Sequence, residues 1–171
     1  MCIRDRSGAD KETHDFYIGG SAVEVKTTAA KSTEKIRISS EHQLNPKDVN
    51  SGLFLYVNMV RKSRTDGETL PVIIDSIQKE LSAYNRSVFF EKLFQYGYIP
   101  ACEEKYNLGF HLRSYQVYAV GNTFPNIVPD ELDKGISEVT YSLDLNVCAD
   151  FITSWDDAVK TLKGGILIGE S

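Results

Sequence analysis

Cysteines and long apolar runs are scarce in this chain. Its 171 residues include three cysteines, Cys2, Cys102 and Cys148, which are too few and too scattered for a disulfide framework or a zinc site. No apolar run approaches the roughly 18–20 residues needed to cross a bilayer, and the first residues lack the apolar stretch of a signal peptide. We therefore expect a protein of the reducing cytoplasm, with no membrane partner.

Positive charge is also in deficit. With 19 Lys and Arg against 24 Asp and Glu, the net charge is −5, which argues against a general electrostatic grip on nucleic acid but leaves room for local contacts. The basic residues gather in two groups, which are either ordinary solvated strand ends and loops or phosphate contacts. The groups are Lys26, Lys31, Lys35 and Arg37, and then Arg61, Lys62 and Arg64.

Two common catalytic signatures are missing. The sequence has no Gly-x-Ser-x-Gly segment, and no cysteine stands in a recognisable catalytic context, which argues against a serine or cysteine hydrolase. The glycines between Gly164 and Gly169 lack the lysine and the following helix of a phosphate-binding loop. ATP use by this chain is therefore not expected.

The apolar pattern predicts an α/β fold, with a mixed central sheet flanked by helices and additional β-strands in the C-terminal part. Strict alternation over 34–39 and a nearly continuous apolar run over 52–60 are typical of strands. Helical spacing appears over 69–84 and from about 86 to 96. The other predicted elements are strands 110–112, 114–120 and 139–147, and a helix that Ser154 caps and Gly164-Gly165 ends.

Length and composition suit a single domain. The chain is 42 % hydrophobic and 25 % charged, as is usual for a globular protein with one sizeable core. We assign residues 8–171 to this domain. Residues 1–7 have the character of a non-native leader, and we expect an N-terminal part of the natural protein to be missing.

A predicted hairpin near the start brings two acids together. Gly19-Gly20 stands between two strand-like runs, and glycine supplies the positive φ that a two-residue turn requires. The resulting register sets Asp15 opposite Glu24, with β-carbons roughly 4.5–5.5 Å apart. Lys26 shares the face of Glu24, because side chains alternate along a strand, while Val23 and Val25 point into the core.

Two opposed carboxylates favour a cation between them. Like charges in this position destabilise a fold unless something positive compensates them, and Mg²⁺ prefers a few carboxylate oxygens and water. The alternative is a surface pair that Lys26 alone relieves. Gln43 has the spacing to close a capping box on Ser40, and His14 is expected to be a polar surface residue that faces away from Asp15.

These residues resemble the PD-(D/E)XK nuclease superfamily, in which one strand carries a metal-binding Asp and the next carries Glu/Asp-x-Lys. More closely, the chain is similar to the PD-(D/E)XK family, formerly a domain of unknown function, that is found in bacterial restriction-type gene clusters. The resemblance covers most of residues 14–147. It rests on His14-Asp15-Phe16, Glu24-Val25-Lys26-Thr27-Thr28, Ile38 to Leu44, Phe124-Pro125, Gly135-Ile136 and Val139 to Leu145.

The resemblance implies a restriction-endonuclease-like fold and a Mg²⁺-dependent DNA endonuclease, with Mn²⁺ able to substitute. Asp15 and Glu24 would hold the metal with the backbone carbonyl of Val25, Lys26 would position or activate the attacking water, and Gln43 would lie beside them. The implied setting is restriction or anti-phage defence, with DNA and other defence-system subunits as partners and a homodimer as an option. The alternative is a non-catalytic DNA-binding or assembly subunit that keeps the nuclease fold.

Overall fold

The computed structural model describes residues 13–30 and 35–167; the expected leader, residues 1–7, lies outside them. The helices are α1 (Leu70–Lys79), α2 (Ala83–Gln95) and α3 (Trp155–Leu167), with 3-10 segments at Pro46–Asp48, Pro100–Lys105, Pro129–Glu131 and Leu145–Phe151. The strands are β1 (Phe16–Ile18), β2 (Ser21–Thr28), β3 (Lys35–Ile38), β4 (Leu53–Ser63), β5 (Glu68–Thr69), β6 (Gly109–Val120), β7 (Tyr141–Asp144) and β8 (Ile152–Thr153).

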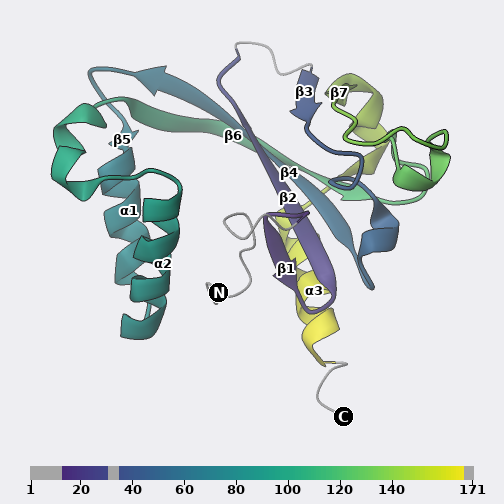
Figure 1. Ribbon diagram of the computed structural model, residues 1–171, viewed down its shortest axis with the longest axis horizontal. Coiled ribbons are helices and arrows are strands. Elements are labelled where there is room, and N and C mark those ends of the chain that lie inside the picture. Colours follow the sequence, from purple (N-terminus) through teal and green to yellow (C-terminus); the bar gives the residue numbers. More distant parts are fainter. Residues whose placement is uncertain (1–12, 31–34, 168–171) are drawn as a thin grey trace.

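A mixed six-stranded sheet forms the centre of the protein, which confirms the predicted fold class (Figure 1). The strand order is β1-β2-β4-β6-β5, and β8 also pairs with β6. Strand β4 is parallel to β2 and antiparallel to β6. Strands β3 and β7 form a separate antiparallel pair, so the C-terminal part does add strands to both sheets.

The two faces of the central sheet are covered by different elements. On one face, Leu53, Leu55 and Val57 of β4 pack in the same core as Ile36 and Ile38 of β3. The alternation predicted for β3 is therefore confirmed. On the other face, a second core includes residues of β2, β4 and β6 together with α3, and it contains Val23, Phe54, Val117, Ala158 and Leu162. Burial on both faces explains why β4 is apolar almost throughout.

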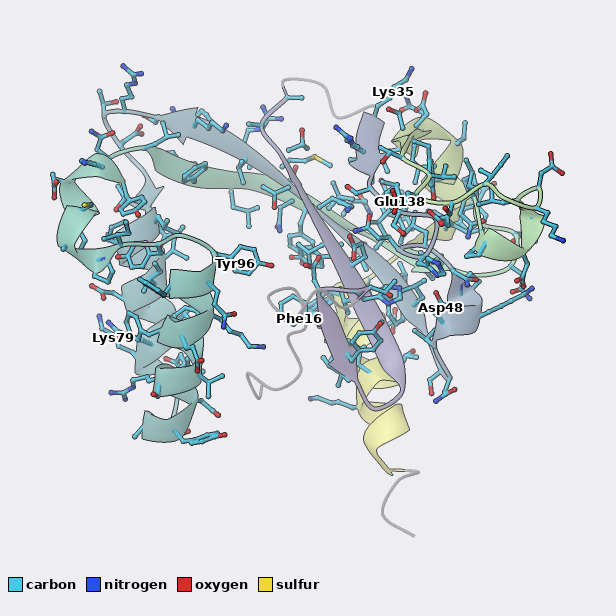
Figure 2. All side chains as sticks on the ribbon, in the orientation of Figure 1. Phe16, Lys35, Asp48, Lys79, Tyr96 and Glu138 are labelled. Atoms are coloured by element: carbon cyan, nitrogen blue, oxygen red, sulfur yellow. The ribbon has the colours of Figure 1, made fainter. Side chains whose placement is uncertain are left out.

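Helices α1 and α2 form an arm at the far end of the β4–β6 ribbon (Figure 1). They share a small core of their own around Ile74, Phe89 and Tyr98. In Figure 2, Lys79 and Tyr96 belong to this arm, whereas Lys35, Asp48 and Glu138 lie on the side of β3 and β7. Within the described ranges, no helix combines the length and apolarity needed to span a membrane.

The predicted hairpin is confirmed from Phe16 to the turn, but the strand pairing does not extend to Asp15 and Glu24. Phe16 pairs with Val23, and the pairing continues to the turn at Gly19 and Gly20. Both glycines have positive φ, 56° and 80°, as the turn geometry requires. The turn is also fixed from outside, because the Gly20 carbonyl accepts hydrogen bonds from two backbone N–H groups of the segment before β4.

Replacing Gly20 by alanine should destabilise the protein. A β-carbon at φ 80° is strained, so we expect the free energy of unfolding to fall by about 1–2 kcal/mol in urea titrations. Gly121→Ala is the matched control, because Gly121 has no positive φ and open space where a β-carbon would lie. Equal losses in the two variants would contradict the assigned turn.

Two predicted boundaries in the middle of the chain are wrong. The helix expected over 69–84 ends at Lys79, and Tyr84 belongs to α2. The Ser82 hydroxyl accepts a hydrogen bond from the Asn85 N–H and caps the new helix, although the apolar spacing runs on across the break. The two strands expected over 110–112 and 114–120 are one strand, β6, with Arg113 as the extra residue of a bulge.

The C-terminal part departs from prediction at both of its elements. The strand expected over 139–147 is reduced to β7. Before β7, the Glu41 side chain binds the backbone N–H groups of residues 138 and 139. After β7, the Asp144 carboxylate accepts a hydrogen bond from the Asn146 N–H, which opens a 3-10 segment. Helix α3 begins as predicted, since the Asp157 N–H donates to the Ser154 hydroxyl. It does not end at Gly164-Gly165 but continues to Leu167, and Gly164 has no positive φ that would stop it.

Candidate active site

Asp15 lies immediately before β1 and is tied to β2. Its Oδ2 accepts a hydrogen bond of 2.9 Å from the backbone N–H of Val25, one residue beyond Glu24 in the hairpin register. The side chain is half-buried. The charge of Asp15 raises the pKa of the Glu24 carboxyl, so the two acids are neighbours, although Asp15 lies outside the paired residues of β1.

Glu24, Lys26 and Gln43 form a connected polar chain on one face of the sheet. The Lys26 Nζ lies 2.6 Å from Glu24 Oε1 and donates a 2.9 Å hydrogen bond to Gln43 Oε1. Glu24 is only 2 % exposed, whereas the Lys26 side chain is 17 % exposed. The structure thus brings the predicted lysine and glutamine together, with the lysine between the buried acid and the surface.

Gln43 contacts Lys26 but does not close the predicted capping box. Its Oε1 accepts from the backbone N–H of Ser39 at 2.9 Å as well as from Lys26. The first bond closes the turn after β3, but onto Ser39 and not onto Ser40 as a capping box would require. One amide oxygen therefore fixes the turn and orients the lysine.

Burial governs the charge of Glu24. It raises the pKa of the Glu24 carboxyl to about 7, and the Asp15 carboxylate adds to this shift. The ammonium of Lys26 and the backbone N–H of Asp15 act in the opposite direction. A carboxyl that titrates near neutrality, with one cation already beside it, is one that a further cation would hold in its ionised form.

The donor set suits a hard divalent cation. Asp15 and Glu24 provide carboxylate oxygens, and the backbone carbonyl of Val25 follows Glu24 directly in sequence. In the described part of the chain, no three His, Cys, Asp or Glu side chains are grouped as a metal site, so the described residues provide two carboxylates here. Mg²⁺ is commonly held by one or two carboxylates and completes its shell with water and phosphate, and the residues therefore fit it.

Glu41 has a structural place outside this site. It is 5 % exposed, and its carboxylate accepts hydrogen bonds from the backbone N–H groups of Glu138 (3.2 Å) and Val139 (2.8 Å). Glu138 has a φ of 58°, which these bonds stabilise. This clamp joins the turn of Gln43 to the segment before β7, and it is also what keeps Val139 out of the strand.

His14 is the residue that the sequence interpretation misplaced. It is 1 % exposed and not a polar surface residue. Its Nδ1 lies 2.8 Å from the Tyr17 hydroxyl. Because His14 precedes the first paired residue of β1, strand alternation gave no signal of its burial.

An apolar cleft of about 600 Å³ lies on the other face of β2, between the hairpin and α3. Its lining includes Val25, Tyr56 and Trp155, and it contains no carboxylate. The side chains of Glu24 and Lys26 point to the opposite face of the strand. The cleft therefore does not belong to the polar site.

Comparison with known proteins identifies one family. A family model described as "Putative PD-(D/E)XK family member, (DUF4420)" matches residues 6–146. The matched range includes Asp15, Glu24, Lys26 and Gln43 and ends just beyond β7. No curated protein and no solved structure matches the chain.

Proposed function

Because the chain belongs to this PD-(D/E)XK family, which it matches over residues 6–146, we propose that it is a Mg²⁺-dependent endonuclease that hydrolyses DNA phosphodiester bonds. The observation that carries the proposal is the convergence of Asp15, Glu24 and Lys26. Two neighbouring carboxyl groups, of which Glu24 has a raised pKa, and an adjacent, partly exposed ammonium are suited to a metal and a phosphate.

In the proposed mechanism, Asp15 and Glu24 hold the divalent cation with the Val25 carbonyl. When bound, this cation supplies positive charge against the negative charge that develops on the scissile phosphate. The Lys26 ammonium is held by Glu24 and Gln43, so it has a fixed position from which to orient the attacking water and to stabilise developing charge. Asp15 keeps its own orientation through the Val25 N–H.

The proposal is tested by DNA cleavage with Mg²⁺ or Mn²⁺, against EDTA, for wild type and Asp15→Asn. Asparagine keeps an acceptor for the Val25 N–H but loses the charge, so we expect the cleavage rate to fall more than about 10²-fold while folding is retained. Asp133→Asn is the control, since this exposed acid is outside the site. Equal nicking by wild type and Asp15→Asn would refute the enzyme, and metal-independent DNA binding without cleavage would favour a non-catalytic subunit.

We propose restriction or anti-phage defence as the biological setting, with other defence-system subunits as partners. Family likeness supports this setting. Co-expression with the neighbouring genes should reduce phage plating, and Asp15→Asn should abolish the reduction. Unchanged plating for the active wild type would place the nuclease in another process.

A further inference from the structure

His14 is an ionisable side chain with almost no access to solvent. Its ring meets that of Tyr17 edge-on, with centroids 5.3 Å apart and an interplanar angle of 84°. Its Nδ1 and the Tyr17 hydroxyl share a hydrogen bond in which either atom can donate. Burying an imidazole is unfavourable unless its two nitrogen atoms form hydrogen bonds. We therefore ask what the buried ring contributes to the protein.

The second ring nitrogen of His14 is buried as well. His14 Nε2 is buried and has no hydrogen-bond partner among the described residues. Burial lowers the pKa of the imidazole, while the Asp48 carboxylate and, less strongly, the backbone carbonyl of Gln43 raise it. The ring is thus bonded to Tyr17 of β1 and is close to the segment that contains Gln43 and Asp48.

This location connects the two halves of the site. The backbone of His14 leads directly into Asp15, which binds β2 through Val25. The side chain of Gln43, on the other half, holds Lys26. His14 is therefore adjacent to the proposed metal ligand Asp15 in sequence and close to the backbone of Gln43.

We propose that His14, held by Tyr17, is a positioning residue of the site, which fixes Asp15 relative to Gln43 and Lys26. The proposal rests on the proposed nuclease function and assigns to the buried ring a task in that function. Neither residue touches the phosphate or the metal. Their effect is to keep the Asp15 carboxylate and the Lys26 ammonium at a fixed distance from each other.

The mildest test is Tyr17→Phe, which removes one hydroxyl and leaves the aromatic ring in the core. Partners behind metal ligands commonly change metal affinity or activity 10–100-fold. We expect kcat to fall about 10-fold with KM unchanged, and the dissociation constant for Mn²⁺, measured by calorimetry, to rise about 3–10-fold. The melting temperature identifies any general loss of stability.

Tyr118→Phe is the matched control, because Tyr118 is a tyrosine of the same core on β6. It should change neither kcat nor Mn²⁺ affinity. His14→Asn is the second variant and should lower kcat at least as much as Tyr17→Phe does. If His14→Asn does not fold, Tyr17→Phe decides the question alone.

The two levels of the proposal fail in different ways. A wild-type protein that neither binds Mn²⁺ nor cuts DNA overturns the nuclease function itself. An active wild type with Tyr17→Phe and Tyr118→Phe alike in kcat and metal affinity overturns only the role of His14. A drop in kcat confined to Tyr17→Phe and His14→Asn, at equal folded fraction, supports the positioning role.

Discussion

Lys26→Met is expected to reduce DNA cleavage by about 10²–10⁴-fold, the range typical of a lost proton-handling or charge-stabilising group. Methionine keeps the stem of the side chain and removes only the ammonium. Glu24 then loses the cation that lies 2.6 Å from its Oε1. The pKa of its carboxyl, already about 7, should rise further, so the residual activity should shift to higher pH.

Lys47→Met serves as the control for Lys26→Met. Lys47 also forms a close ion pair, 2.7 Å from Asp130, but both side chains are about two-thirds exposed. Such pairs contribute little to stability, and this one is outside the site. We would compare the single-turnover rates of DNA cleavage by wild type, Lys26→Met and Lys47→Met from pH 6 to pH 9. Equal rates for Lys26→Met and wild type at every pH would remove the lysine from the mechanism.

Glu24→Gln should abolish cleavage and yet stabilise the metal-free protein at alkaline pH. The pKa of Glu24 is about 7 in the folded protein, above its ordinary value of 4.5. Between these two values the folded chain keeps a proton that the unfolded chain releases. The stabilisation that the protonated Glu24 carboxyl gives the folded protein is therefore complete below about pH 4.5, and it is lost as pH rises through 7. The loss is on the order of 3 kcal/mol.

The measurement is urea unfolding in EDTA from pH 5 to pH 8.5, for wild type and Glu24→Gln. The buried His14 has a lowered pKa, which acts in the opposite sense on stability. It is common to both proteins, so their difference isolates Glu24. We expect the free energy of unfolding of Glu24→Gln to increase relative to that of wild type as pH rises. We also expect Mn²⁺ to stabilise only the wild type. A difference that does not vary with pH would contradict the raised pKa.

The hairpin could be read from the sequence because its determinants are local. Gly19-Gly20 sets the turn, and the period of two then places Glu24 and Lys26 on one face. The same reasoning placed Ile36 and Ile38 in the core. Gln43 was found through its likeness to the family, and the structure shows its amide on Lys26.

What the sequence did not disclose depends on contacts between distant segments. The pairing of Glu41 with the backbone near residue 138 shortens β7, and no local pattern announces a carboxylate that binds N–H groups almost a hundred residues away. The burial of His14 depends likewise on Tyr17 and the turn of Gln43. The break after α1 has a local cause, the Ser82 cap of α2. The apolar spacing did not reveal it, because Leu81 and Tyr84 continue the helical period across Ser82.

The hydrogen bonds of Glu41 to residues 138 and 139 set a lower limit on how far the chain can be shortened without disturbing the candidate site. Removing everything after residue 137 would spare all four predicted site side chains in sequence. It would nevertheless strip Glu41 of both its N–H donors and leave an ionised group buried with nothing to satisfy it. Gln43, two residues away, would then lose this support, so we expect that a shortened form of the chain must retain the residues through β7.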